Sequence, residues 1–155
     1  MKIFISLFMF FFAAACGNAQ EPMRLDVHAE KLTVYDQAEM LGQFDIEIAH
    51  TEAQRSAGLM HRVDLPESSG MLFVFDGEAQ RFFWMQNTPT PLDIIYADTK
   101  GVIVHIARDT TPFSTTPIPS RAPAQYAFEI HAGLSQKLGI NVGQTLEHPV
   151  IGAAQ

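Results

Sequence analysis

The sequence predicts a mainly β protein, an antiparallel sandwich or flattened barrel with one or two short helices. Residues 44–48 read FDIEI and alternate apolar with polar side chains, and strands are also predicted over 71–75 and 126–131. Successive side chains of a strand point to opposite faces, so this period indicates strands with one buried face. About seven or eight short strands with two short helices favour an antiparallel two-layer or barrel arrangement.

A hairpin is predicted between residues 92 and 107. Two apolar runs flank the residues DTKG, from Asp98 to Gly101. A type I turn closed by a glycine in the left-handed conformation joins two antiparallel strands in this way.

Two short helices are predicted from their end signals. Thr51 is placed to cap the first helix, Gln54 to complete a capping box, and Gly58 to end it. A weaker pattern over 133–140 predicts a second helix that ends at Gly139.

The chain divides into a signal segment over 1–19, a tether over 20–31 and a single β-rich domain over 32–152. An apolar run follows Lys2 and is too short to span a bilayer as a mature helix. Residues 20–30 are polar and without periodicity, as is typical of a tether. With 155 residues, 47% of them hydrophobic, the chain is long enough for one core.

Two cleavage sites are compatible with the signal segment. The residues AAAC, which end at Cys16, are similar to a bacterial lipobox, in which this cysteine becomes the lipidated first residue. The alternative is ordinary cleavage after Ala19. Cys16 is the only cysteine, which favours lipidation because an exported protein has little other use for one thiol. We expect an exported protein, either periplasmic or anchored to the membrane through this lipid alone.

The charge of the chain argues against nucleic acid as a partner. The formal net charge is -7, and the ten Lys and Arg residues are scattered along the sequence. Nucleic acid and anionic membrane surfaces attract clustered positive charge. The expected partner is an unknown small molecule or an envelope protein.

Residues 82–93 read FFWMQNTPTPLD and are the first candidate site. As a strand, this stretch places Trp84 on one face and Met85 on the other, and neither face is polar. One interpretation is that both side chains are core. The other is that one face lines a ligand pocket, for which Trp84 offers a stacking surface.

The polar half of the same stretch supplies the remaining candidates. Asn87, Thr88 and Asp93 surround two prolines, as in an ordinary turn. Alternatively, Asn87 and Asp93 form a cluster at a pocket mouth. A buried aspartate needs a cation or several hydrogen-bond donors, and Arg55 or Arg62 could supply the cation. The proline-rich loop over 108–124, predicted to lack regular structure, could cover this site.

Catalytic and metal-binding signals are few. The sequence has no glycine-rich phosphate loop and no GxSxG motif, and its six histidines never occur in pairs at ligand spacing. We therefore predict no cofactor, no metal and no catalytic residue. Asp45 and Glu47 share a strand face, which we interpret as a solvated outer face rather than a carboxylate pair.

Four segments resemble the domain of unknown function 192 (DUF192) family of small bacterial and archaeal proteins, which are often exported. They are EIAHTEAQRSAGLMHR (47–62), GMLFVF (70–75), FFWMQNTPTPLDIIYAD (82–98) and AQYAFEIHAG (124–133). The resemblance implies an all-β sandwich-like fold with a short helix and no established activity. This chain differs from the family pattern at Gln54, where Glu is more frequent, and at Gln86, where Lys or Arg is usual.

Together these observations suggest an envelope-associated module that binds a ligand or partner and has no catalysis of its own. The alternatives are a hydrolytic enzyme acting on envelope glycans and a purely structural envelope protein. An acid such as Asp93 or Glu129 facing His105 or His131 across a cleft would favour the enzyme. A surface around Trp84 without any concavity would favour the structural role.

Overall fold

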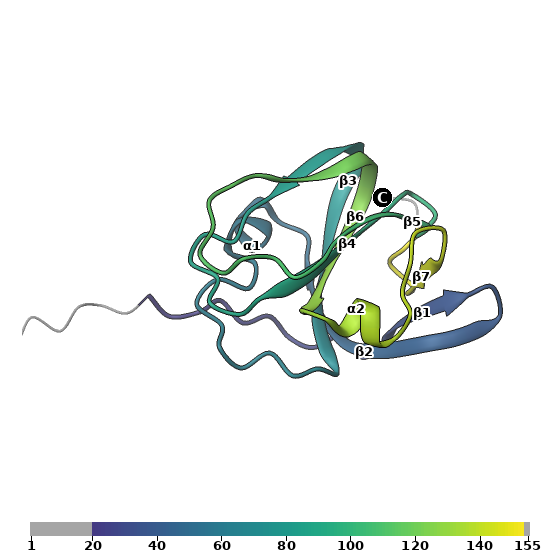
Figure 1. Ribbon diagram of the computed structural model, residues 1–155, viewed down its shortest axis with the longest axis horizontal. Coiled ribbons are helices and arrows are strands. Elements are labelled where there is room, and N and C mark those ends of the chain that lie inside the picture. Colours follow the sequence, from purple (N-terminus) through teal and green to yellow (C-terminus); the bar gives the residue numbers. More distant parts are fainter. Residues whose placement is uncertain (1–19, 154–155) are drawn as a thin grey trace, which may run out of the picture.

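A computed structural model describes residues 20–153 and confirms that the protein is mainly β. Its seven strands form one curled sheet, a half-barrel, and its two helices are short (Figure 1). The strands are β1 (Leu32–Asp36), β2 (Glu39–Ala49), β3 (Ser69–Phe83), β4 (Leu92–Ala97), β5 (Ile103–Ala107), β6 (Ile118–His131) and β7 (Thr145–Glu147). The helices are α1 (Glu52–Ala57) and α2 (Leu134–Lys137).

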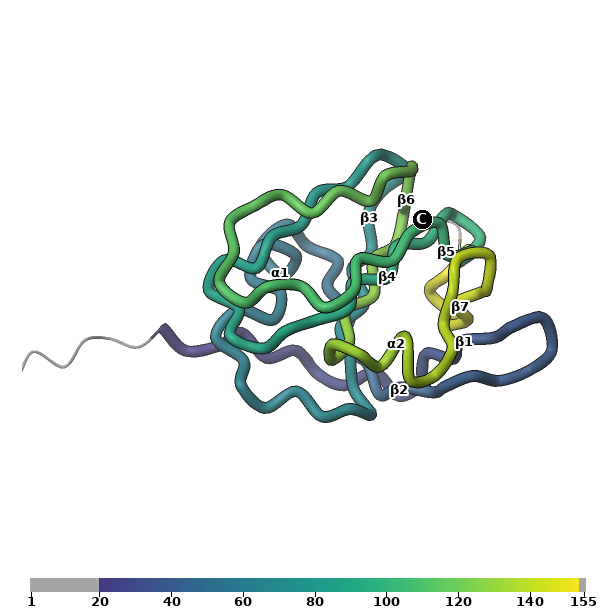
Figure 2. The backbone as a smooth tube through the Cα atoms, viewed as in Figure 1, coloured from purple at the N-terminus to yellow at the C-terminus, as the bar shows by residue number. Residues whose placement is uncertain are grey.

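The sheet is mixed rather than wholly antiparallel. Its order is β5-β4-β6-β3-β2-β1-β7, and β2 and β3 pair in parallel from Asp45–Ser69 to Ala49–Phe73. A parallel pair needs a crossover, which α1 and the residues after it supply. Alternation along a strand does not report the direction of its neighbour, so the sequence could not reveal this pair. The trace in Figure 2 shows the curl, whose two edges are joined where the Ile103 N–H donates to the Gln144 carbonyl at 2.8 Å.

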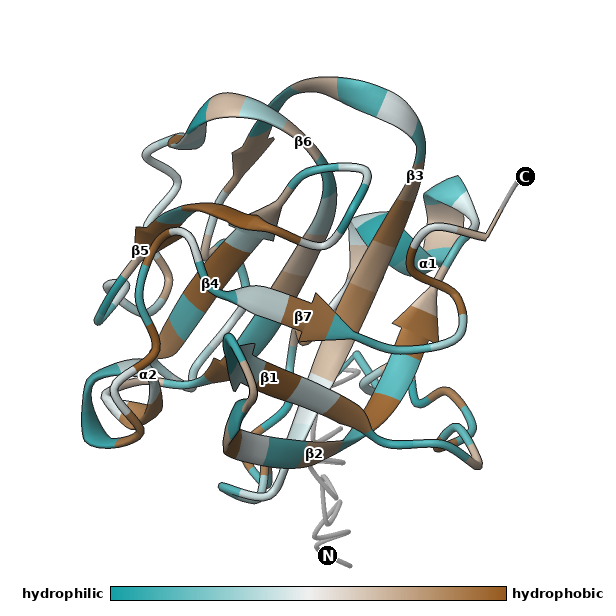
Figure 3. Ribbon diagram, turned by 90° about the vertical axis from the view of Figure 1, so that its right-hand side faces the viewer, coloured by the Kyte–Doolittle hydropathy of each residue, from teal (hydrophilic) through white to brown (hydrophobic). Residues whose placement is uncertain are grey.

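Apolar side chains pack on both faces of the sheet. In β3, Leu72 and Val74 belong to the core inside the curl, whereas Met71 and Phe73 belong to a second core on the outer face. The outer core lies towards α1, which sits across β3 from β1 and β7 (Figure 1). The hydrophobic colour along β3 and β4 in Figure 3 follows from this double burial. Strands buried on both faces read as continuous apolar runs.

The elements predicted from local signals are confirmed. Thr51 caps α1, its side chain accepts the Gln54 N–H, and the Gln54 side chain accepts the Thr51 N–H in return, which completes the capping box. Gly58, with a φ of 46°, ends the helix. The hairpin between β4 and β5 turns through Gly101, whose φ of 81° is in the left-handed region that favours glycine.

The proline-rich segment is shorter than predicted. β6 begins at Ile118, and Pro119 and Pro123 pair with β3, so only residues 108–117 form a loop. This half of β6 has β3 as its single neighbour, because the pairing with β4 begins at Tyr126. Proline is tolerated in a strand where its missing N–H faces no partner.

The predicted tether is held against the domain. The His28 N–H donates to the Ile46 carbonyl at 2.8 Å, and Val27 forms an isolated antiparallel bridge with Glu47. The signal segment and Cys16 lie outside the described residues, so export and lipidation stay predictions. No helix within residues 20–153 has the length and hydrophobicity needed to cross a membrane.

Candidate functional site

The aromatic stretch separates its side chains by face. β3 ends at Phe83, and the alternation continues so that Phe83 and Met85 pack in the outer core while Phe82 and Trp84 turn to solvent. Met85 is fully buried, but Phe82 is 64% exposed and Trp84 50% exposed. The core interpretation is therefore correct for Met85 and wrong for Trp84.

Trp84 lies at a pocket between α1 and β3, which we call the α1–β3 pocket. Its volume is about 340 Å³. Apolar side chains form most of its wall, among them Leu59, Met60, Phe73, Phe75, Phe82 and Phe83. Five polar side chains also line it: Glu52, Arg55, Ser56, Thr88 and Glu129. A concave, largely apolar pocket with few polar groups is the usual form of a small-molecule site.

Aromatic packing fixes the position of Phe83 in this wall. Its ring meets Phe73 edge-on at 5.0 Å between centroids and Tyr96 at 5.6 Å. Edge-to-face contacts of this kind are favoured by the ring quadrupoles and hold the rings in one orientation. The wall is therefore preformed.

Glu129 places a carboxyl group in this apolar wall. The residue is 5% exposed, and within the described part of the chain its carboxyl makes no hydrogen bond. Burial raises the pKa of Glu129 to about 8, so the side chain is neutral at physiological pH. It lies between the buried Phe128 and Ile130 on β6, and it lines the same pocket as residues of α1 and β3.

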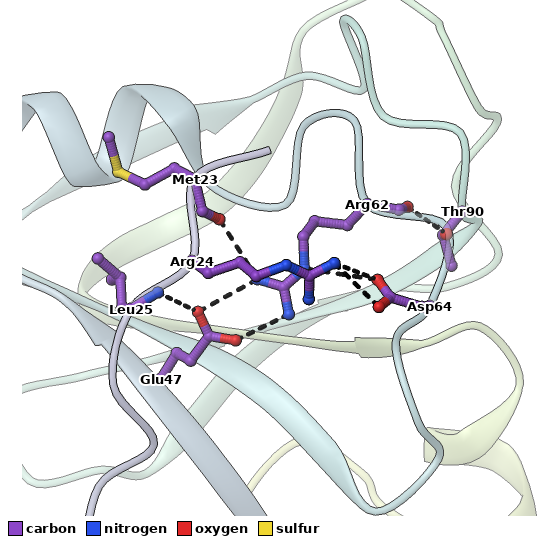
Figure 4. A network of polar contacts seen from close by, with 7 residues as sticks. All are labelled: Met23, Arg24, Leu25, Glu47, Arg62, Asp64 and Thr90. Carbon is purple, nitrogen blue, oxygen red and sulfur yellow. Dashed lines mark hydrogen bonds and ion pairs between the residues drawn. The ribbon is translucent and has the colours of Figure 1, made fainter. Parts of the chain in front are cut away.

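Arg62 lies outside the α1–β3 pocket and forms a buried ion pair with Glu47 (Figure 4). Its two terminal nitrogens donate to Glu47 Oε1 at 2.8 Å and Oε2 at 3.2 Å. The Leu25 N–H also donates to Glu47, and Thr90 donates to the Arg62 carbonyl. The interpretation of Glu47 as solvated is therefore wrong, because Arg62 and the N-terminal segment cover it.

Asp93 is fully buried on the opposite face of the sheet from the α1–β3 pocket. Its carboxylate accepts hydrogen bonds from the N–H of Asp109 and from both the N–H and the hydroxyl of Ser135. Alternation along β4 places Asp93 with the inner core, whereas Tyr96 belongs to the outer one. The predicted pairing of Asp93 with Arg55 or Arg62 is wrong, because the sheet lies between them.

Asn87 and Thr88 serve the turn after β3. Asn87 has a φ of 56°, and its carbonyl accepts the His61 N–H at 2.7 Å. Thr88 donates to the Gln86 carbonyl and reaches the pocket wall. The loop over 108–117 packs directly on this turn, where Met85 donates its N–H to Ser114 at 2.8 Å. The loop is therefore hydrogen-bonded to this turn. The pocket beside Trp84 is bounded by α1 and β3 rather than by the loop.

Comparison with known sequences identifies the family of this fold. The profile of the DUF192 family, described as an uncharacterized ACR, matches residues 33–148. This chain belongs to the DUF192 family. The resemblance seen in the sequence is thereby confirmed.

Two solved structures are similar to this DUF192 protein. A protein of Sinorhizobium meliloti 1021, described as a "putative transcription regulator", is 31% identical with a TM-score of 0.75, covering 81% of this chain and 97% of that one. A protein of unknown function from Novosphingobium aromaticivorans DSM 12444 is also 31% identical, with a TM-score of 0.74, covering 85% and 100%. A search of curated proteins found no match.

Among residues 20–153, neither His105 nor His131 of this DUF192 protein lines the α1–β3 pocket or forms a hydrogen bond with Asp93 or Glu129. His105 stacks on Tyr96 at 6.0 Å, and the walls of the α1–β3 pocket include no histidine. The arrangement that would favour a hydrolytic enzyme is therefore not found within residues 20–153. The concave surface around Trp84 likewise differs from the expectation for a purely structural role.

Two distant histidines do meet elsewhere. His28 Nδ1 lies 3.2 Å from His148 Nε2, and Glu30 completes a group of possible metal ligands. However, the His28 Nδ1 also accepts the Glu30 N–H, and the His148 Nδ1 accepts the Val150 N–H. Burial and the nearby His28 lower the pKa of His148. Because the His148 Nδ1 is an acceptor, its Nε2–H can donate to the His28 Nδ1, and this hydrogen bond accounts for the contact.

Proposed function

We propose that this DUF192 protein is an exported envelope module that binds a small, largely apolar molecule in the α1–β3 pocket. The observation that carries the proposal is the exposure of Trp84 and Phe82 beside a preformed cavity that contains the unpartnered carboxyl of Glu129. Large aromatic side chains left exposed together around a concavity are typical of binding sites.

The position of Glu129 supports a ligand with a polar group. Burying a carboxyl group without a partner lowers the stability of the fold, and such groups with strongly shifted pKa values concentrate at functional sites. In its neutral form, the Glu129 side chain can donate one hydrogen bond and accept others. A ligand that reaches the wall would satisfy this carboxyl.

The cellular part of the proposal rests on the sequence. The signal segment and the lipobox-like residues before Cys16 support export. The net charge of -7 argues against nucleic acid, so the description of the Sinorhizobium protein as a regulator is not extended to this chain. Mass spectrometry of the mature N-terminus tests export: a lipidated Cys16 or a free Gln20 supports it, and an uncleaved chain contradicts it.

The binding proposal can be tested by fluorescence because Trp84 is the only tryptophan. We expect 3-phenylpropanol and 3-cyclohexylpropanol to change Trp84 emission in a saturable manner. Ala57 lines the pocket, so Ala57→Leu should fill part of it and weaken binding. Ala53 is exposed on the same helix, and Ala53→Leu is the matched control. Absence of saturable change with these probes and with the charged phenyl probes described below would contradict the proposal.

A further inference from the structure

We propose that the ligand is an anion, with a carboxylate or phosphate bound by Arg55 at the α1–β3 pocket and Arg81 adding positive potential beside it. This inference rests on the proposed function and specifies the chemical class of the ligand. The apolar body of the ligand would lie against the aromatic wall, with its charged group at α1.

Two guanidinium groups flank one aromatic ring of the pocket wall. The Cζ atom of Arg55 lies 5.1 Å from the centre of the Phe75 ring, and that of Arg81 lies 4.1 Å from it. Phe75 and Arg55 both line the pocket. Stacking on an aromatic ring orients a guanidinium and leaves its edge free for hydrogen bonds.

Both arginines are held in place by backbone carbonyls. Arg55 donates through Nη1 to the carbonyls of His50 and Val74, the latter at 2.9 Å. Arg81 donates through Nε to the Ala124 carbonyl at 3.0 Å and through Nη2 to that of Gly77. Carbonyl oxygens fix these positions without cancelling the positive charge.

The charge of this pair is not neutralised by a carboxylate. Among the described residues, neither Arg55 nor Arg81 forms an ion pair, whereas Arg24 and Arg62 each bind an acidic side chain. Burial and, to a smaller extent, repulsion from Arg55 lower the pKa of Arg81, and nearby Asp76 partly offsets this decrease. Two guanidiniums without an ion-pair partner among residues 20–153 indicate a site that attracts an anion.

The remaining hydrogen-bonding capacity suits an oxyanion. The Nε and Nη2 atoms of Arg55 make no hydrogen bond to residues 20–153, and this edge of a guanidinium binds a carboxylate or phosphate with two parallel bonds. Glu129 is mostly protonated at physiological pH, which reduces its repulsion of an anion. Glu52, the other acid that lines the pocket, is exposed on α1.

The proposal is tested with matched probes and Trp84 fluorescence on the purified protein. We expect 3-phenylpropionate to bind at least about tenfold more tightly than the neutral 3-phenylpropionamide, since hydrogen bonds to charged groups are the stronger ones. The cation 3-phenylpropylamine should bind most weakly. 2-Phenylethyl phosphate identifies the preferred anion, and tighter binding of either anion than of the amide supports the proposal.

Two further comparisons distinguish an effect of the Arg55 charge from a loss of the folded state. Arg55→Gln should remove the preference for the anion, whereas Lys100→Gln, at an exposed position of the β4–β5 turn, should retain it. If Arg55→Gln fails to fold, added NaCl should weaken the wild-type affinity for the propionate and not for the amide. Equal affinity for anion and amide, or a preference for the amine, would overturn this inference while leaving the binding pocket established. Failure of every probe would overturn the proposed function itself.

Discussion

Glu129→Gln should stabilise this protein, and the gain should depend on pH. The pKa of Glu129 is about 8 in the folded protein, against an ordinary value of 4.5. Between these two values, the folded protein holds a proton that the unfolded chain has lost. The free energy of unfolding of the wild type therefore falls as pH rises through this range. Glutamine has the same shape and cannot ionise, so the variant lacks this loss.

The size of the effect follows from the pKa difference. Each pKa unit corresponds to about 1.4 kcal/mol, so the variant should be more stable than the wild type by up to about 5 kcal/mol at pH 8 and above. Near pH 4.5 the two proteins should differ by less than about 0.5 kcal/mol, because Glu129 is then protonated in the folded state and still about half protonated in the unfolded chain. The gain should increase steadily between these limits.

Urea unfolding followed by circular dichroism, repeated from about pH 5 to about pH 9, measures this difference directly. Other groups titrate equally in both proteins and cancel in the comparison. Glu39→Gln, at an exposed position at the start of β2, is the control and should show no comparable trend. A constant difference between Glu129→Gln and wild type across this range would refute the assignment of a buried, neutral carboxyl. Lower stability of the variant at pH 8 would refute it as well.

Two pairs of variants test the roles of the candidate residues. Arg62→Leu should lower the free energy of unfolding by about 3–5 kcal/mol in the same urea assay, because it leaves Glu47 buried without its cation. Arg24→Leu removes an exposed ion pair and should lower it by about 1 kcal/mol or less. A similar loss for both arginines would contradict the buried pair. Met85→Ala should lower the free energy of unfolding by about 2–5 kcal/mol, because it truncates a core side chain. Trp84 is half exposed, so Trp84→Ala should lower it by about 1 kcal/mol or less. The same Trp84 variant should abolish probe binding measured by calorimetry. Unchanged binding by the Trp84 variant would contradict its place in the pocket.

The polar candidates show how the structure revises a site predicted from one stretch of sequence. Residues 82–93 contain both Trp84 and Asp93, which the sequence suggested as parts of one site. They lie in different environments, since Asp93 turns to the inner core and binds Ser135, while Trp84 turns to solvent beside α1. Proximity along the chain does not place two side chains on one face of a sheet.

Elements whose causes are local can be predicted from the sequence alone. The capping box of Thr51 and Gln54 and the left-handed turn at Gly101 depend on residues three or four positions apart, so they could be predicted from one sequence. The period of two likewise determined that the protein is mainly β. The tertiary structure decided the parallel pairing of β2 with β3 and which outward-facing side chains are covered. Glu47 and Glu129 follow the same alternation as solvated residues, but Arg62 covers the first, and the second is buried at the α1–β3 pocket. Burial depends on segments distant in the chain, and for that reason the pocket and its neutral acid appear only in the folded protein.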